Sequence, residues 1–411
     1  MKILVLNSGS SSQKTALFDL QGRSQEPLAP LWRAEIEWQG NEASATSYSP
    51  RGKSKDRFQA EEDNRSAALR QILERLWSGK SPILASIAEI KIVGHRVVHG
   101  GPKLREPAII NAEVKKNIAD AADFAPLHNR EELDGIAMIE HLLPQIPQVA
   151  VFDTGFHRTL PPAAMFYPGP YEWRARGIQR YGFHGINHQY CAQRVAYLMK
   201  KELAEMKIVS CHLGNGCSLA AIDGGRSVET TMGFTPLEGL MMGTRSGSID
   251  PGIITYLLRQ DKTTAEEMDD LLNKQSGLKG ISGISHDMRE VLHAMQAGDE
   301  RARLAFDMFV HRLQTGIGAM SAALNGCDAL VFTAGIGENS PEVRSSVCER
   351  LQFFGVCIDS KKNAEPCKDQ DISASGSRVR VFTVRAQEDW AIAHECLHQY
   401  QALQDAQSPL K

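Results

Sequence analysis

A strand, a polar turn containing glycine and a second strand occur twice in the sequence, about two hundred residues apart. The first copy covers residues 3–22, with its turn at 8–12, and the second covers residues 207–226, with its turn at 214–218. Apolar runs on both sides of each turn predict two β-hairpins. The repetition favours a chain built from two similar halves, and a coincidence between two ordinary hairpins is the alternative.

The rest of the chain alternates between the two kinds of secondary structure. Apolar strands are predicted at 90–98 and 149–154, and residues 40–65 form loops or edge strands. Helices are predicted at 66–77, 111–124, 130–143, 251–259, 264–274 and 300–324, with a strand-turn-helix unit at 329–344 and a final helix at 389–403. This alternation indicates an α/β protein. The length of 411 residues favours two domains, which we place at 1–150 with 387–411, and at 151–386. The final helix would pack back on the first domain.

Charge and hydropathy exclude several classes of protein. The 46 Lys and Arg residues are dispersed among 49 Asp and Glu residues, so we expect neither a nucleic-acid partner nor a membrane surface. The first residues contain only four consecutive apolar side chains, and no stretch reaches the ~18 that a membrane span needs. The eight cysteines include no C-x-x-C pair, which is typical of reduced thiols. These features predict a cytoplasmic protein.

Three glycine-containing turns each follow an apolar strand, at residues 7–12, 214–218 and 335–339. Glycine permits a phosphate to approach the backbone closely, and unpaired N–H groups at such turns attract anions. Each turn is therefore a candidate phosphate cradle, although tight turns also use glycine for structural reasons. Neither a P-loop nor a G-x-G-x-x-G motif is present, so a nucleotide would bind in another way.

Charged and imidazole side chains stand in glycine-rich or strand-end segments at 94–101, 126–129, 152–154, 182–185 and 243–247. An arginine among small residues suits a bidentate grip on carboxylate or phosphoryl oxygens, and a structural ion pair is the alternative. Histidines four residues apart (His95 with His99, and His184 with His188) raise the question of a zinc site. The first pair lies on a predicted strand and the second lacks the Glu of H-E-x-x-H, so zinc is disfavoured.

Seven sequence runs together resemble the acetate kinase family of short-chain acyl kinases, and they follow the order of that family. They are LVLNSGSSSQK (4–14), GHRVVHGG (94–101), FDTGFH (152–157), RYGFHG (180–185), CHLGNG (211–216), MGTRSG (242–247) and GIGEN (335–339). The resemblance implies the acetate and sugar kinase, heat-shock-protein and actin fold, with a duplicated α/β core and an interdomain cleft. It also implies reversible, in-line phosphoryl transfer from ATP to acetate, Mg²⁺ or Mn²⁺ as cofactor, and a homodimer.

The same resemblance assigns roles to residues. Asp153, His184 and Arg245 would be catalytic, and the metal ligands would be Asn7 and Glu388. The acetate site would consist of Arg96, Val98, Leu127, Phe183 and Pro236. The nucleotide site would consist of Lys14, His212, Leu213, Gly214, Asn215, Gly216, Asp287, Met288, Arg289, Gly335, Ile336, Gly337, Glu338 and Asn339.

These residue types suit the chemistry. Acetate is ionised at neutral pH, so its attacking oxygen needs no general base, and catalysis depends on positioning and charge neutralisation. Asp153 is then better explained as orienting Mg²⁺ or an arginine than as the catalytic acid of the family. The sequence departs from the family at Ala334, at Ile186 and Asn187, and at 385–389, which bears on the metal contact of Glu388.

Three other functions are open. A propionate or butyrate kinase differs from an acetate kinase by a few pocket side chains, and the bulk of Phe183 favours acetate. A non-catalytic actin-like nucleotide switch would share the fold without needing Arg96, His184 and Arg245 together. A phosphatase acting on acyl phosphates would hydrolyse them without ADP.

Overall fold

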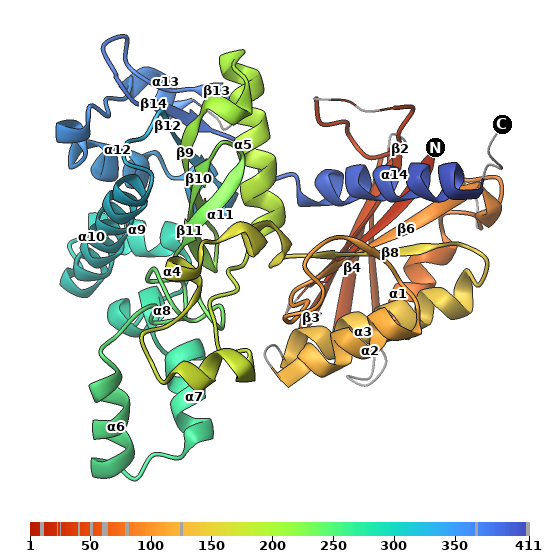
Figure 1. Ribbon diagram of the computed structural model, residues 1–411, viewed down its shortest axis with the longest axis horizontal. Coiled ribbons are helices and arrows are strands. Elements are labelled where there is room, and N and C mark those ends of the chain that lie inside the picture. Colours follow the sequence, from red (N-terminus) through yellow and green to blue (C-terminus); the bar gives the residue numbers. More distant parts are fainter. Residues whose placement is uncertain are drawn as a thin grey trace. The chain divides into compact units, whose positions relative to one another are not determined.

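The computed structural model describes residues 1–8, 12–22, 24, 26–39, 42–49, 52–59, 65–78, 82–123, 126–365 and 369–407. The chain divides into two compact units (Figure 1). Unit 1 comprises residues 1–155 and 387–411, and unit 2 comprises residues 156–386. The chain therefore passes between the units twice, near residues 155 and 386.

An eight-stranded mixed sheet forms the centre of unit 1, in the order β5-β4-β3-β2-β1-β6-β8-β7. Its strands are β1 (Lys2–Ser8), β2 (Ser12–Asp19), β3 (Trp32–Gln39), β4 (Glu42–Ser49), β5 (Gly52–Gln59), β6 (Ile90–Val97), β7 (Ala108–Ile109) and β8 (Gln148–Phe152). β1, β2 and β3 form an antiparallel meander, whereas β1, β6 and β8 run parallel.

Unit 2 repeats this arrangement in a six-stranded sheet, in the order β11-β10-β9-β12-β14-β13. Its strands are β9 (Lys207–Leu213), β10 (Cys217–Asp223), β11 (Arg226–Thr230), β12 (Ala329–Thr333), β13 (Gln370–Asp371) and β14 (Arg380–Thr383). The meander is again antiparallel, β9, β12 and β14 are parallel, and a short antiparallel strand lies at the edge. Each unit thus has its meander and its parallel strands in the same order, so the duplicated α/β core predicted from the two hairpins is confirmed.

The helices of unit 1 are α1 (Arg65–Glu74), α2 (Ala112–Asp120), α3 (Pro126–Leu142) and α14 (Glu388–Gln407). Those of unit 2 are α4 (Pro162–Met165), α5 (Gly185–Met199), α6 (Pro251–Gln260), α7 (Ala265–Lys274), α8 (Gly277–Ser282), α9 (Met288–Gln296), α10 (Glu300–Ala323), α11 (Ala334–Asn339), α12 (Pro341–Glu349) and α13 (Ser360–Ala364). No described helix is long and apolar enough to cross a membrane.

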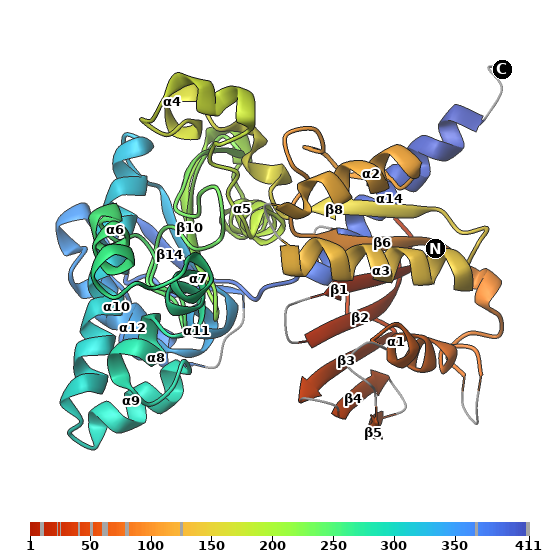
Figure 2. The same ribbon diagram turned by 90° about the horizontal axis from the view of Figure 1, so that it is seen from below.

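Helices cover both faces of the unit 1 sheet (Figure 2). Consecutive strand residues point to opposite faces. Val93 packs with Ile139 of α3, whereas Gly94, the next residue, faces α14. A Cβ atom at Gly94 would lie 2.5 Å from Sγ of Cys396, so the glycine permits α14 to lie close to the sheet.

Most predicted elements are present, and the differences have identifiable causes. The predicted helix at 111–124 ends as an α-helix at Asp120, with Asn111 as its N-cap as expected. Helix α5 was not predicted, because its N-cap residue His184 has a left-handed backbone and no capping side-chain hydrogen bond. The tip of the first hairpin, residues 9–11, lies outside the described residues.

Candidate active site

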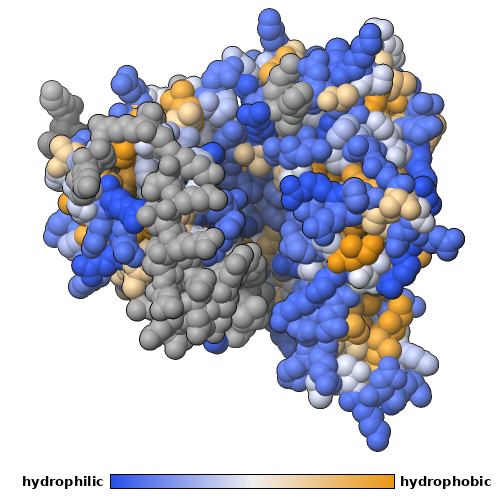
Figure 3. All heavy atoms as spheres, turned by 180° about the vertical axis from the view of Figure 1, so that it is seen from behind, coloured by the Kyte–Doolittle hydropathy of each residue, from blue (hydrophilic) through white to orange (hydrophobic). Residues whose placement is uncertain are grey.

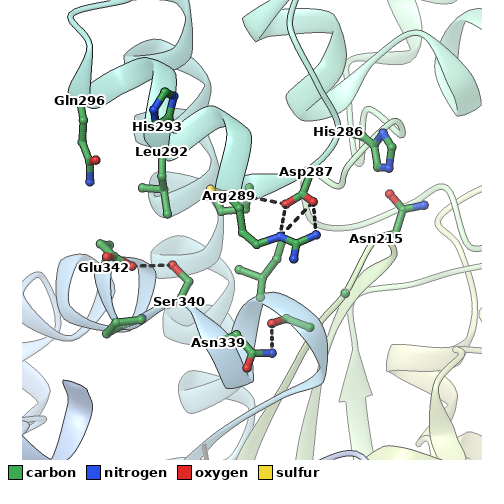
Figure 4. A pocket seen from close by; sticks show the side chains of 15 residues that line it. Asn215, His286, Asp287, Arg289, Leu292, His293, Gln296, Asn339, Ser340 and Glu342 are labelled. Carbon is green, nitrogen blue, oxygen red and sulfur yellow. Dashed lines mark hydrogen bonds and ion pairs between the residues drawn. The ribbon is translucent and has the colours of Figure 1, made fainter. Parts of the chain in front are cut away.

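A cavity of about 770 Å³ opens in unit 2 between α9, α11 and the β9–β10 turn (Figure 4). Its lining residues are Gly214, Asn215, His286, Asp287, Met288, Arg289, Leu292, His293, Gln296, Gly335, Ile336, Asn339, Ser340, Pro341 and Glu342. Eight of these are predicted nucleotide residues, drawn from three segments far apart in sequence. The volume and the mixture of backbone, polar and apolar groups suit a nucleotide.

Asp287 and Arg289 form one wall of this cavity. Asp287 is the N-cap of α9 and accepts the backbone N–H of Arg289 at 2.9 Å, while the Arg289 guanidinium donates to the same carboxylate. These hydrogen bonds from Arg289 lower the pKa of Asp287 despite partial burial. The carboxylate therefore stays ionised and holds Arg289 at the cavity.

Seven lining residues were not predicted. Leu292, His293 and Gln296 follow Arg289 at spacings of three, four and seven, so they occupy the same face of α9, and helical periodicity from Arg289 could have identified them. His286, Ser340, Pro341 and Glu342 adjoin predicted residues along the chain.

Residues 335–339, predicted as a turn, belong to helix α11, and hydrogen bonds from the rest of unit 2 hold this helix in place. Oε1 of Glu338 accepts the N–H groups of Ala334 (3.0 Å) and Ala386 (2.8 Å). Nη1 of the buried Arg344 donates to the carbonyl oxygens of Gly337 and Glu338, at 2.8 and 2.9 Å. Glu338 and Gly337 thus support the helix, whereas Gly335, Ile336 and Asn339 line the cavity.

The other predicted nucleotide residues are placed differently. Leu213 is fully buried at the end of β9, and His212 is buried before it. Lys14 belongs to unit 1, where its ammonium lies 3.7 Å from Glu35.

Predicted catalytic and acetate-site residues of unit 2 lie around Gly216. A Cβ atom built on Gly216 would lie 3.4 Å from Nη1 of Arg245 and 3.5 Å from Nε2 of His184. The His184 ring stacks on that of His212, with centroids 3.9 Å apart. Nη1 of Arg245 also donates to the carbonyl oxygen of Pro236 at 3.4 Å, and Phe183 is buried next to His184. Burial lowers the pKa of Arg245. A half-buried guanidinium that donates to a carbonyl oxygen favours an anionic ligand.

Arg96 and Asp153 form an ion pair at the carboxyl ends of the parallel strands β6 and β8 in unit 1. Nη2 of Arg96 donates to Oδ2 of Asp153 at 2.8 Å. Burial alone would lower the pKa of Arg96, but the carboxylates of Asp153, Glu388 and Glu132 outweigh it and raise this pKa. Arg96 therefore remains charged.

Glu132 of α3 was not predicted as a site residue, and it binds the backbone just after the end of β6. Both of its carboxylate oxygens lie 3.1 Å from the N–H of Val98, another predicted acetate-site residue. Burial raises the pKa of Glu132 to about 8, against the opposing influence of Arg96 and of this N–H. The side chain of Leu127, the fifth predicted acetate-site residue, lies outside the described part of the structure.

Asn7 lies beside two carboxylates at the start of α14. Its Nδ2 donates to Oδ1 of Asp389 (2.8 Å) and lies 3.4 Å from Oε2 of Glu388. Burial raises the pKa of Asp389, and the neighbouring charge of Glu388 adds to this. Two adjacent carboxylates and an amide oxygen suit a hard cation such as Mg²⁺. Among the described residues, no group of three His, Cys, Asp or Glu side chains could hold a metal, so any Mg²⁺ would also need amide, water or phosphate oxygens.

The duplicated core and the nucleotide-sized cavity are features of a class of two-unit, nucleotide-dependent phosphotransferases. The profile of the Acetokinase family matches residues 2–394, and the chain belongs to this family. It is 53% identical to the acetate kinase of Gloeobacter violaceus over 401 residues, covering 96% of this chain and 98% of that protein. It is 52% identical to the acetate kinase of Microcystis aeruginosa over 97% of this chain and 99% of the relative.

Solved structures of the family have the same fold. The Porphyromonas gingivalis acetate kinase superimposes with a TM-score of 0.89 at 39% identity, over 97% of this chain and 99% of that one. A propionate kinase from Francisella tularensis gives a TM-score of 0.88 at 35% identity, with the same coverages. The family resemblance inferred from the seven sequence runs is therefore confirmed.

Proposed function

We propose that this protein is an acetate kinase, which transfers the γ-phosphoryl group of ATP directly to acetate and forms acetyl phosphate and ADP reversibly. The observation that carries the proposal is the cluster of Arg245, His184 and His212 around Gly216, beside a nucleotide-sized cavity in the same unit. Cationic and N–H groups of this kind can stabilise phosphoryl oxygens, which supports the proposal.

Arg96 supplies the acetate site in this proposal. Its guanidinium stays charged and is aimed by Asp153, so it can bind the acetate carboxylate, while Val98 covers the methyl group. Asp153 then orients Arg96 and takes no proton, because ionised acetate has none to give. His184 and Arg245 stabilise the negative charge on the equatorial oxygens of the transferred group.

Asn7 and Glu388 are the proposed Mg²⁺ ligands, and Asp389 joins them as a third oxygen donor because it contacts Asn7. Mg²⁺ held there would offset phosphate charge and so lower the barrier to transfer. Mn²⁺ has similar ligand preferences and is the alternative cation.

Two further proposals concern the cellular location of the protein, which we propose to be cytoplasmic, and its oligomeric state. The described cysteines are free, and burial raises the pKa of Cys217 to about 12, which agrees with a reducing cytoplasm and unreactive thiols.

Helix α6 exposes Ile253, Tyr256 and Leu258, and apolar residues are visible on the projection made by α6 and α7 (Figure 3). We propose that a homodimer covers this face. Light scattering tests this proposal. We expect a dimer for the wild type and a monomer for the double variant Ile253→Lys/Leu258→Lys.

The experiment for the activity is the initial rate of ADP formation from ATP and Mg²⁺ with acetate, propionate, butyrate or no acid. We expect turnover that requires an acid and is fastest with acetate. A higher rate with propionate would instead identify a propionate kinase, the alternative that the Francisella tularensis structure supports. ATP turnover that ignores the acid would favour the nucleotide-switch alternative.

A further inference from the structure

Three buried side chains continue from His184 into the protein as a chain of hydrogen bonds. Nδ1 of His184 lies 2.9 Å from Oγ of Ser218, which lies 2.8 Å from Nε2 of His188. Nδ1 of His188 lies 2.8 Å from Oγ of Ser210. Ser210, Ser218 and His188 are fully buried, on β9, β10 and α5 respectively.

The buried imidazole of His188 forces an ordered arrangement of the hydrogens in this chain. Burial lowers the pKa of His188 well below its usual value, and His157 and His212 add to the effect, so the ring is neutral. A neutral imidazole donates from one nitrogen and accepts at the other. Each serine hydroxyl has a single hydrogen, so fixing one donor orders the whole chain.

The chain has two ordered states. In the first, Ser210 donates to His188, His188 donates to Ser218, and Ser218 donates to Nδ1 of His184, which leaves the proton of a neutral His184 on Nε2. In the second, all three bonds reverse, and Nδ1 of His184 donates to Ser218, either from a protonated ring or from the neutral Nδ1–H tautomer. Nε2 of His184 therefore carries a hydrogen in the first state and in the protonated ring, but not in a neutral ring of the second state.

We propose that a neutral His184 adopts the first state, so that Ser218 and His188 are positioning residues for the phosphoryl transfer, which hold the Nε2–H group of His184 toward Gly216 and Arg245. The proposal rests on the proposed function for its catalytic consequence, although the ordering of the chain can be measured without it.

The backbone around His184 also constrains the position of the His184 ring. His184 has a φ of 55°, and Gly182 before it has a φ of 73°. Nε2 of the buried His157 lies 3.0 Å from the carbonyl oxygen of Phe183 and must donate to it, because that oxygen only accepts. Left-handed backbone is strained for a non-glycine residue, so its presence here indicates a constrained position.

His212, stacked on His184, has a similar arrangement. Its Nδ1 accepts from Nδ2 of Asn187 at 2.8 Å, so a neutral His212 ring also carries its hydrogen on Nε2. Nε2 of His212 lies 3.6 Å from a Cβ built on Gly214, and Nε2 of His184 lies 3.5 Å from one built on Gly216. The two stacked rings thus present N–H donors to the same turn.

A matched pair of substitutions tests the proposal in the full-length chain. The amide of Asn matches the Nδ1 position of histidine and the amide of Gln matches Nε2, so His188→Gln keeps the link to Ser218 and His188→Asn loses it. We expect His188→Asn to lower kcat about 10–100-fold, with KM for ATP within about twofold of wild type, and His188→Gln to retain most of kcat. Equal losses in both variants, or full activity in His188→Asn, would overturn the proposal.

A second measurement does not depend on activity. Nitrogen-15 NMR of the histidine rings, with the His184 signals assigned from His184→Gln, reports which ring nitrogen carries the hydrogen. At a pH where the ring is neutral, we expect the Nε2–H tautomer in the wild type and in His188→Gln, and a mixture in His188→Asn. A mixture in the wild type would contradict the proposal. Absent acetate-dependent turnover in the wild type would instead refute the proposed function, and the tautomer result would still stand.

Discussion

Nη2 of Arg96 donates to Oδ2 of Asp153 at 2.8 Å, and Asp153 is only 1% exposed. The two residues come from the ends of adjacent parallel strands and are 57 positions apart. The hydrogen bond and the ion pair direct this carboxylate at the guanidinium of Arg96. The geometry therefore supports Asp153 as the group that aims Arg96.

Asp153→Asn tests this role. The amide keeps the shape of the carboxylate but loses its charge, so Arg96 is less well held, and we expect kcat/KM for acetate to fall about 100-fold. KM for ATP should stay within about twofold, since the nucleotide cavity belongs to unit 2. Steady-state kinetics at several Mg²⁺ concentrations is the measurement. Recovery at high Mg²⁺ would assign Asp153 to the metal instead, and unchanged activity would contradict both roles.

Gly216→Ala should impair catalysis while the protein stays folded. The new Cβ would make van der Waals contact with Nη1 of Arg245 at 3.4 Å and Nε2 of His184 at 3.5 Å, and so would fill the space in which phosphoryl oxygens are proposed to reach these two groups. We expect kcat to fall about 10-fold or more. Gly376→Ala is the matched control, because nothing lies within 4 Å of a Cβ there, and it should keep wild-type kcat. Equal kcat in the two variants would show that the Gly216 contacts are unimportant.

Ala334→Gly should stabilise the protein. Ala334 has a φ of 65° at the start of α11, a conformation that costs alanine about 1–2 kcal/mol and glycine little. The greater unfolded-state entropy of glycine offsets about 0.5–1 kcal/mol of this. The net gain of about 0.5–1 kcal/mol should appear as a small rise in the thermal midpoint. A lower midpoint would show that the methyl group, near Gly214, contributes more by packing than its backbone costs.

Glu132→Gln should change the pH dependence of stability. The pKa of Glu132 is raised from 4.5 to about 8 in the folded state, so between these values the folded protein binds a proton that the unfolded chain has lost. The stability contributed by this group is fully present below pH 4.5 and is lost as the pH rises through about 8. The free energy of unfolding of the wild type should therefore fall relative to Glu132→Gln between pH 5 and 8. Denaturant titrations of both proteins at pH 5 and pH 8 measure their free energies of unfolding. A difference between the two proteins that stays the same at both pH values would contradict the raised pKa of Glu132.

The sequence was most informative where local patterns decide the structure. The hairpins, most of the helices and the glycine turn at 214–218 follow from apolar periodicity and turn residues, whereas the predicted turn at 335–339 forms helix α11. The family resemblance supplied the candidate roles. Contacts made only by folding were not predicted: Glu132 reaches Val98 from another element, and Asp389 reaches Asn7 from the far end of the chain. The role of His188 likewise depends on serines of two strands, which its spacing from His184 does not reveal.

The central claim is tested most directly by phosphorus-31 NMR of the protein with ATP, Mg²⁺ and acetate. Direct transfer to the carboxylate predicts that acetyl phosphate and ADP appear together in equal amounts, and that both are absent without acetate. ADP accompanied by inorganic phosphate and no acetyl phosphate, or no reaction, would contradict it.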